Sequence, residues 1–221
     1  MKKKKSSFLF SIVFILLVLN SFKIISQESI VFEKLNFENN DIQSIVYGIS
    51  EDDYGNVWFA TEEGVIRYNS KETYLYDINK GLPNGISNRV YSIIKDRKGV
   101  IWIGSTNGIA FYNNKKDLFE NISNNDIKLD RTNALTSDKN NNIWIATDNG
   151  LWICDQNKKL KNVISNIRVF HIFYYNNEVY YTSTSGVFKI KYNNSKIQNI
   201  KITDRIKDVS VLKIFNSEIY L

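Results

Sequence analysis

The chain has few of the residues on which most catalytic and metal sites depend. Its 221 residues include one histidine, His171, one cysteine, Cys154, one methionine and one proline. This supply rules out a zinc or iron site and Cys–His or Ser–His machinery. No disulfide can form within the chain, so its core has to stabilise the fold. We therefore expect no enzyme, and we assign no catalytic, cofactor-binding or metal residue; the ligand-binding residues stay unknown.

An excess of positive charge is confined to the N-terminus. The formal net charge is +6, from 29 basic and 23 acidic residues. Five lysines precede the first acidic residue, Glu28, and the rest of the chain has 24 basic against 23 acidic side chains. A nucleic-acid partner would need a basic surface on the folded body, so none is expected.

The first 26 residues resemble a secretory signal peptide. Lysines at 2–5 precede an apolar run, Phe8–Leu19, and a polar stretch that ends at Ser26. The run is short for a membrane span, which needs about 20 residues. The sequence thus predicts residues 1–26 as a signal peptide and a periplasmic or extracellular location. An uncleaved anchor is the alternative, and membrane contact is expected only through it or through parts beyond this sequence.

An aromatic frame recurs along the remainder of the chain. In each copy an aromatic residue is followed by a hydroxyl residue three positions later and by a glycine six positions later. The aromatic residues are Trp58, Trp102, Trp144 and Tyr180, the hydroxyl residues Thr61, Ser105, Thr147 and Ser183, and the glycines Gly64, Gly108, Gly150 and Gly186. Such a period of about 40 residues is typical of repeat architectures.

Each copy divides into short strands separated by turns rich in Asp, Asn and Gly. The second strand carries the aromatic residue, and the third strand follows the glycine. Predicted first strands are 45–50, 90–94, 131–136 and 167–173; fourth strands are visible only at 73–78 and 119–122. Four antiparallel strands per unit describe a propeller blade, so the predicted fold is an all-β propeller.

The unit boundaries give four blades and half of a fifth. We place the propeller at residues 27–221, with units at about 41–80, 81–125, 126–163, 164–203 and 204–221. The fifth unit stops at its aromatic position, Tyr220, which predicts an incomplete ring, a fragment of a longer protein, and self-association through an open edge. A closed ring of four or five blades is the alternative. The segment 30–37 is a candidate for the strand that completes a last blade.

Counting back from the aromatic residues predicts which side chains lie near the propeller axis. The positions ten residues earlier are Gly48, Ser92, Ala134, Phe170 and Ser210, all small except Phe170. By the same count, His171 matches Ile49 and is a structural core residue. Cys154 matches Tyr68 and Tyr112, so it is expected to be a buried thiol that packs as an apolar group.

The repeat resembles a known family. Ser92 to Tyr112, preceded by Gly81-Leu82-Pro83 and Val90, is close to the two-component regulator propeller repeat, and Ser50 to Tyr68 follows the same pattern. The resemblance implies the extracytoplasmic sensor region of a bacterial hybrid two-component system, in which many members respond to polysaccharide breakdown products. A kinase or DNA-binding output is implied only by the resemblance.

The turn carboxylates Asp52, Asp53, Asp96 and Asp138 are the nearest approach to paired catalytic acids. Asp52, Asp96 and Asp138 hold the same turn position in the three units that keep a tryptophan. We therefore interpret these carboxylates as turn residues. The copies do not share Glu62, Glu63 and Arg67, which leaves these three available for function. The unequal loops 77–89, 113–131 and 193–207 are the expected places for ligand selectivity.

The leading hypothesis from the sequence is a non-enzymatic, exported sensor module that binds a small-molecule or oligosaccharide ligand. Two alternatives remain: an exported propeller enzyme acting on polysaccharide, and an exported protein-interaction scaffold.

Overall fold

The computed structural model describes residues 44–122, 127, 129–193, 196–203, 213–215 and 218–220. The predicted signal peptide, the strand candidate 30–37 and the axis position Ser210 lie outside these residues. The predicted ends of the propeller region are therefore not tested.

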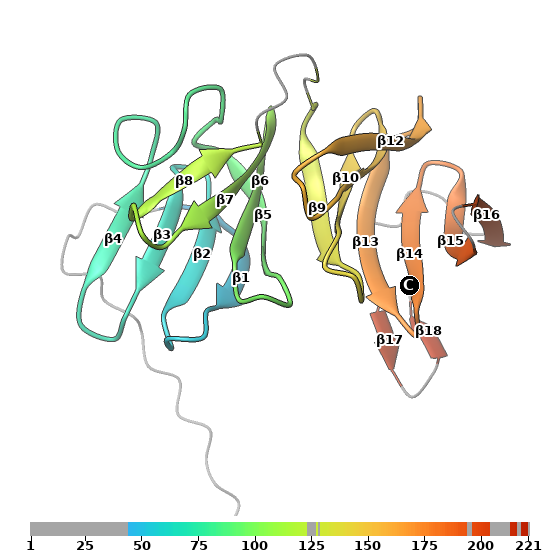
Figure 1. Ribbon diagram of the computed structural model, residues 1–221, viewed down its shortest axis with the longest axis horizontal. Helices are drawn as coiled ribbons and strands as arrows, with labels where there is room; N and C mark the ends of the chain where they lie inside the picture. The colour runs from blue at the N-terminus through green and yellow to red at the C-terminus, as the bar shows by residue number, and fades with distance from the viewer. Residues whose placement is uncertain are drawn as a thin grey trace, which may run out of the picture. The chain divides into compact units, whose positions relative to one another are not determined.

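All regular structure in the described residues is β-strand, arranged as four four-stranded antiparallel sheets and one strand pair (Figure 1). Strand order within each sheet follows the chain. Blade 1 is β1 (Val46–Glu51), β2 (Val57–Thr61), β3 (Val65–Tyr68) and β4 (Thr73–Tyr76); blade 2 is β5 (Val90–Lys95), β6 (Ile101–Ser105), β7 (Gly108–Asn113) and β8 (Leu118–Asn121). Blade 3 is β9 (Thr132–Ser137), β10 (Ile143–Thr147), β11 (Gly150–Cys154) and β12 (Leu160–Ser165); blade 4 is β13 (Val169–Tyr175), β14 (Glu178–Ser183), β15 (Gly186–Asn193) and β16 (Lys196–Thr203). The pair is β17 (Lys213–Phe215) with β18 (Glu218–Tyr220).

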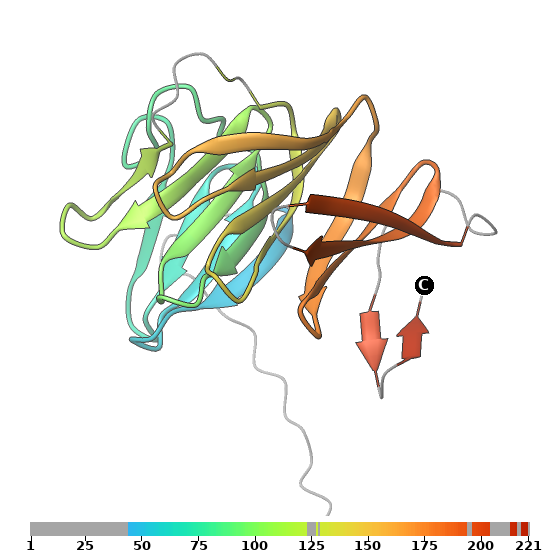
Figure 2. The ribbon, with the colours of Figure 1, turned by 45° about the vertical axis from the view of Figure 1, so that its right-hand side comes forward.

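The first strands of successive blades lie side by side. β5 contacts β1 on one side and β9 on the other, and β9 contacts β13. Figure 2 shows the sheets of blades 1, 2 and 3 stacked on one another in the order of the chain. This arrangement confirms the predicted all-β propeller architecture.

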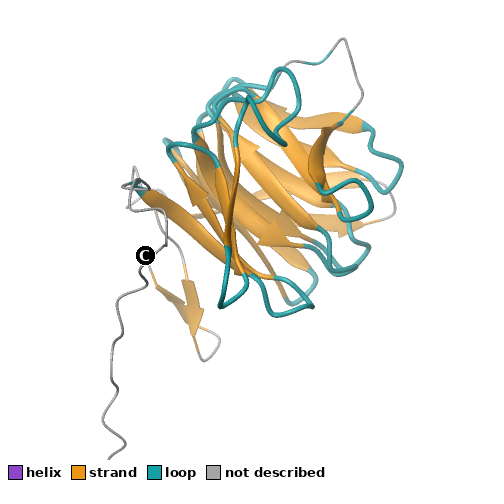
Figure 3. Ribbon diagram, turned by 90° about the vertical axis from the view of Figure 1, so that its left-hand side faces the viewer, coloured by secondary structure: helices purple, strands orange, loops and turns teal. Residues whose placement is uncertain are grey.

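Loops and strands account for all the described backbone in Figure 3. Within that part of the chain, no helix is long and apolar enough to span a membrane.

The fourth strands of blades 3 and 4 are additions to the sequence prediction. β12 and β16 have weak hydrophobic patterns, since each is the outermost strand of its sheet and leaves much of its surface in water. A strand that buries only one partial face gives little alternation to detect. As predicted, the second strand of blade 1 carries the aromatic residue of the repeat, since Trp58 lies in β2.

An aspartate in the β1–β2 turn organises the repeat. One carboxylate oxygen of Asp52 accepts hydrogen bonds from the backbone amides of Tyr54 and Asn56, each at 2.9 Å. The other accepts the indole N–H of Trp58 at 2.8 Å. The equivalent indole bonds join Trp102 to Asp96 at 2.8 Å and Trp144 to Asp138 at 3.0 Å. These three aspartates are therefore turn residues, as predicted.

Blade 4 has lost the aspartate and the tryptophan together. Glu178 begins β14, directly after the β13–β14 turn, and the hydroxyl of Tyr180 donates to its carboxylate at 2.8 Å. Tyr180 occupies the register position of the tryptophan, opposite Phe173, but it is only half-buried. The buried aromatic residue of this strand is the next one, Tyr181.

The hydroxyl residue and the glycine of the repeated frame form a second local hydrogen-bonded turn. The hydroxyl of Thr61 donates to the carbonyl oxygen of Gly64 at 2.9 Å and accepts the amide of Glu63 at 3.2 Å. Gly64 has φ of 139°, and a Cβ there would lie 2.2 Å from the carbonyl oxygen of Tyr76. Equivalent bonds in the other blades join Ser105 to Gly108, Thr147 to Gly150 and Ser183 to Gly186. In all four blades the hydroxyl of the frame therefore bonds within its own blade.

Three hydrophobic clusters fill the spaces between blades. Trp58 packs between blades 1 and 2, with its ring centroid 4.7 Å from that of Tyr112 and 6.0 Å from that of Phe119. Trp102 belongs to the cluster between blades 2 and 3, and Trp144 to the cluster between blades 3 and 4. Each tryptophan thus fastens its own turn and fills the contact with the next blade.

The axis position of blade 4 belongs to His171, so its assignment to Phe170 was wrong. His171 pairs with Thr182 as Gly48 pairs with Ala60, and Phe170 falls in the register shift beside it. The counting failed because the β13–β14 hairpin is one residue shorter than the β1–β2 hairpin. The match of His171 to Ile49 was likewise wrong, because the residue in that position is Ile172. His171 is a packing residue, but its Nδ1 is buried without a hydrogen-bond partner among the described groups.

Candidate functional site

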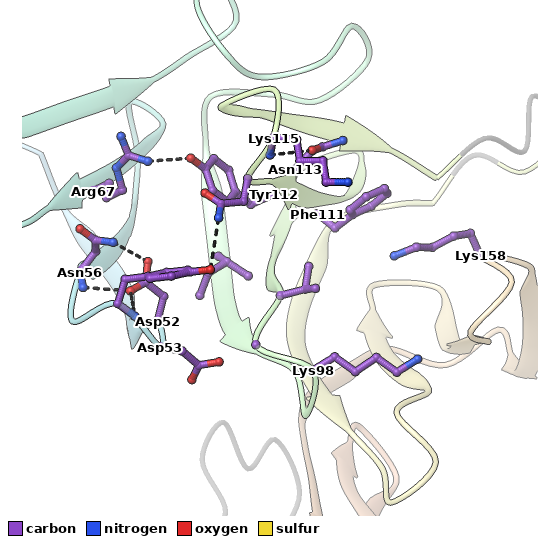
Figure 4. A pocket seen from close by; sticks show the side chains of 15 residues that line it. Asp52, Asp53, Asn56, Arg67, Lys98, Phe111, Tyr112, Asn113, Lys115 and Lys158 are labelled. Atoms are coloured by element: carbon purple, nitrogen blue, oxygen red, sulfur yellow. Dashed lines mark hydrogen bonds between the residues drawn. The ribbon is translucent and has the colours of Figure 1, made fainter.

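A pocket of about 490 Å³ opens where the β1–β2 turn of blade 1 meets the third strand of blade 2 (Figure 4). Its volume falls within the range of about 300–1,000 Å³ typical of small-molecule sites. The lining consists of polar turn residues, aromatic rings and basic side chains: Asp52, Asp53, Tyr54, Asn56, Arg67, Lys98, Gly99, Val100, Ile101, Phe111, Tyr112, Asn113, Asn114, Lys115 and Lys158.

Arg67 forms one wall of the pocket. Its guanidinium donates to the Tyr112 hydroxyl at 2.6 Å and to a carboxylate oxygen of Asp117 at 3.0 Å. It also lies over the rings of Trp58, Tyr74 and Tyr76, at 5.4, 4.6 and 5.5 Å. Arg67 comes from blade 1 and Asp117 from blade 2, so this ion pair joins the two blades.

The charge of Asp117 is stabilised by its neighbours. Tyr76 and Tyr112 donate their hydroxyls to the same carboxylate oxygen as Arg67. Partial burial raises the pKa of Asp117, but these hydroxyl bonds and the positive charge of Arg67 outweigh it and hold the pKa below its usual value. Arg67 is therefore already neutralised within the protein.

The turn of blade 1 forms a second wall. Asp52 is committed to its own turn and to Trp58, and Asp53 pairs with Lys95 at 2.7 Å. Tyr54 at the tip of the turn is 78% exposed. The side-chain amide of Asn114 reaches the Tyr54 hydroxyl across the pocket at 3.5 Å. An exposed tyrosine beside a hollow is a ready stacking surface for a ligand.

Lys158 comes from blade 3 and faces the pocket from the other side. Its Nζ lies 3.6 Å from the ring centroid of Phe111 and 3.9 Å from that of Trp102. Figure 4 shows the side chain extended toward Phe111, across the pocket from Arg67. Burial lowers the pKa of Lys158, because an ammonium group is less stable away from water.

A smaller pocket of about 200 Å³ lies in the corresponding place between blades 3 and 4. Asp138, Trp144 and Tyr174 are among its lining residues. Hollows therefore recur beside the turn aspartates, and the one between blades 1 and 2 is larger and carries more basic side chains.

The structure separates the three residues that the repeat copies did not share. Arg67 lines the pocket, Glu62 pairs with Arg89 of blade 2, and Glu63 is exposed. Of the predicted variable loops, the segment 113–131 contributes its first residues to the pocket, and the loop 77–89 lines a separate hollow through residues 81–83.

Sequence reasoning missed Tyr54 and Lys158. The available signal for Lys158 was that it breaks the repeat: the last residue of the corresponding turn in blade 2 is an aspartate, Asp117. Recognising this required the register of the outer strands, which the sequence did not predict for blade 3.

The other two residues considered for chemistry are not exposed: Cys154 is buried and His171 is half-buried. Cys154 is free and fully buried, and burial raises the pKa of its thiol to about 12. This agrees with the predicted packing role. Burial also lowers the pKa of His171. Among the residues that the structure describes, no group of three or more His, Cys, Asp or Glu side chains is placed to hold a metal ion.

Strand order, the turn aspartates and the contacts between blades define a β-propeller. Residues 39–63 and 84–107 match the family model described as two component regulator propeller. The chain therefore contains repeats of the two-component regulator propeller family. No curated protein matches the chain.

Solved structures share the fold. The chain resembles the extracellular domain of a protein described as a hybrid two-component system from B. thetaiotaomicron, with a TM-score of 0.61 and 20% identity over 76% of this chain and 24% of that one. A second structure of the same extracellular domain, described there as that of a one component system, has a TM-score of 0.60 and 22% identity over 75% of this chain and 24% of that one. The chain thus spans about a quarter of the length of this domain.

A propeller enzyme is also similar. Virginiamycin B lyase from Staphylococcus aureus, in a catalytically inactive variant, has a TM-score of 0.57 and 20% identity over 78% of this chain and 60% of that one. At such identities the likeness concerns the fold alone.

Proposed function

We propose that this chain is the ligand-sensing propeller of an extracytoplasmic, non-enzymatic sensor protein, and that its ligand is a carbohydrate breakdown product. The observation that carries the proposal is the pair of family repeats at 39–63 and 84–107, which lie in the two blades that enclose the larger pocket. The similarity to the extracellular domain of a protein described as a hybrid two-component system supports a location outside the cytoplasm.

The pocket has the features that a sugar-binding site needs. Tyr54, Phe111 and Tyr112 offer aromatic surface for the apolar face of a sugar ring, and Asn114 and Lys115 offer hydrogen-bond donors. The ion pair between Arg67 and Asp117 holds the arginine in the wall on which such a ligand would rest.

The proposal is tested by titrating the purified chain with a panel of oligosaccharides and following tryptophan fluorescence and heat of binding. Binding without release of a shortened product supports a sensor. Product release supports the alternative of a propeller enzyme. Absence of binding to every saccharide contradicts the carbohydrate part of the proposal and favours an interaction scaffold.

Substitution of Tyr54 by alanine tests whether the saccharide binds in this pocket. Because Tyr54 is largely exposed, the variant should fold as the wild type does. It should weaken saccharide binding by about fivefold or more, the loss expected when one aromatic contact is removed. Unchanged binding would place the ligand elsewhere on the protein.

A further inference from the structure

The contact between blades 1 and 2 and the contact between blades 2 and 3 each involve a charged residue from the turn between the third and fourth strands. The two residues have opposite charges. Asp117 immediately precedes β8, in the turn that the Asn113–Leu118 pair closes. Lys158 lies two residues before β12 and immediately precedes Lys159, whose carbonyl oxygen accepts the Asp155 amide and closes the β11–β12 turn. Asp117 and Lys158 have positive φ, 52° and 63°, and both side chains reach back to the preceding blade. Asp117 meets a cation there, Arg67. Lys158 meets Phe111, the residue of blade 2 that corresponds to Arg67.

Among the described residues, Lys158 thus forms no ion pair of the kind that Asp117 forms with Arg67. Within the part of the chain that the structure describes, no carboxylate lies within 4.0 Å of the Lys158 ammonium group. Asp96 and Glu120 favour its charged form only from beyond that distance. The aromatic rings stabilise the ammonium group in part, but they cannot replace an anion in a half-buried place.

The other charges of the pocket do not balance Lys158. Besides Arg67, which is paired with Asp117, the basic residues Lys98, Lys115 and Lys158 line the pocket, against Asp52 and Asp53. Both carboxylates are already engaged, Asp52 by its turn and Asp53 by Lys95. Lys98 donates to the neutral amide oxygen of Gln156 at 3.0 Å, so it brings a second positive charge to the same side.

We propose that the pocket between blades 1 and 2 selects an acidic sugar, whose carboxylate or sulfate group binds Lys158 while its ring lies against Phe111 and Tyr54. This inference rests on the proposed carbohydrate-sensing function and adds the chemical class of the ligand. A charge-assisted hydrogen bond to a partly desolvated ammonium group is stronger than a neutral one, so it supplies both affinity and selection. Lys98 adds attraction for the same group from the edge of the pocket.

The binding experiment compares four probes on the purified chain: a glucuronate-containing disaccharide, a sulfated disaccharide, a neutral disaccharide and inorganic sulfate. We expect the acidic disaccharides to bind at least about tenfold more tightly than the neutral one. The glucuronate-containing and the sulfated disaccharide together show whether the pocket prefers a carboxylate or a sulfate group. Inorganic sulfate shows whether the anion is recognised without its sugar.

Three variants locate the effect. Lys158→Met keeps an apolar stem against Trp102 and Phe111 and should reduce binding of the acidic disaccharides about tenfold, with little change for the neutral one. Lys158→Arg should restore most of the binding. Lys159→Met removes the same charge from the adjacent exposed residue, which does not line the pocket, and should bind as the wild type does. Melting curves of all three confirm that they are folded.

The outcomes separate this inference from the proposed function. Equal binding of neutral and acidic disaccharides, or acidic binding that survives Lys158→Met, would overturn the acidic-sugar inference and leave carbohydrate sensing intact. Binding of inorganic sulfate but of no saccharide would contradict both the carbohydrate function and the acidic-sugar inference. If Lys158→Met then abolished sulfate binding, Lys158 would still be the residue that recognises the anion. No binding of any probe would contradict both.

Discussion

The indole N–H of Trp58 and a carboxylate oxygen of Asp52, six residues earlier, form a buried hydrogen bond of 2.8 Å. This contact links the turn at one end of the blade to the cluster between blades 1 and 2. The same bond is present in blades 2 and 3 and is missing from blade 4, where neither partner remains.

Loss of the Asp52 carboxylate should destabilise the protein substantially. Asp52→Ala leaves the indole N–H and two turn amides without their acceptor, and we expect the free energy of unfolding to fall by about 2–3 kcal/mol. Urea denaturation followed by tryptophan fluorescence measures the change. The adjacent Asp53→Ala is the matched control: its carboxylate is largely exposed and pairs only with Lys95, so the midpoint should hardly move. Equal effects of the two substitutions would contradict the assigned role.

The contribution of Asp52 should depend on pH in a defined direction. Burial raises its pKa, but hydrogen bonds from Asn56, Trp58 and the turn amides outweigh burial and place the pKa below the ordinary 3.8. A depressed folded-state pKa adds stability above the unfolded pKa, and this is lost as the pH falls through the folded value. The difference in unfolding free energy between wild type and Asp52→Ala should therefore narrow below about pH 3.8. A constant difference down to about pH 2 would show that ionisation of Asp52 is unimportant.

Arg67 and Asp117 should be energetically coupled. A double-mutant cycle with Arg67→Met and Asp117→Asn should give a coupling energy of about 1 kcal/mol, because the guanidinium is mostly buried among aromatic rings and the carboxylate is partly exposed. The pair Lys116–Glu120 joins the β7–β8 turn to β8 in the same blade, with an exposed ammonium group and, among the described residues, no aromatic ring against it. It is the comparison and should show a coupling energy of at most about 0.3 kcal/mol. Equal coupling in both pairs would mean that the aromatic surroundings add nothing.

Two glycines in blade 1 should respond very differently to alanine. Gly64→Ala places a Cβ 2.2 Å from the Tyr76 carbonyl oxygen, and we expect a loss of about 3 kcal/mol or more. Gly55 has φ of 79° and nothing within 4 Å of a Cβ, so Gly55→Ala should cost only the backbone strain of about 1 kcal/mol. Thermal melts of the two variants test the ranking. A Gly55 variant less stable than the Gly64 variant would contradict it.

The sequence predicted those features of the fold that are local and repeated. The roles of Asp52, Thr61 and Gly64 follow from spacing alone, because each contact lies within a few residues of its partner. The axis position of His171 could not be found in this way, since one residue fewer in a hairpin shifts the count but not the pairing. Register has to be observed for such a residue.

The candidate site was less predictable than the fold because it is made between blades. Tyr54, Phe111 and Lys158 come from three different units and meet only when the units pack together. Periodicity identifies what each unit shares, whereas the pocket depends on where the units differ. Arg67 was recognised as a departure from the repeat, but its partner Asp117 was not.

The opposite charges at Asp117 and Lys158 have a consequence for the order of the blades. A chain with blades 2 and 3 exchanged would bring Lys158 against Arg67 inside a cluster of aromatic rings, where two cations would repel each other away from water. The charges of the outer turns thus favour packing of each blade against its correct neighbouring blade and disfavour packing against the wrong one. Units that are interchangeable in backbone are not interchangeable in position along the chain.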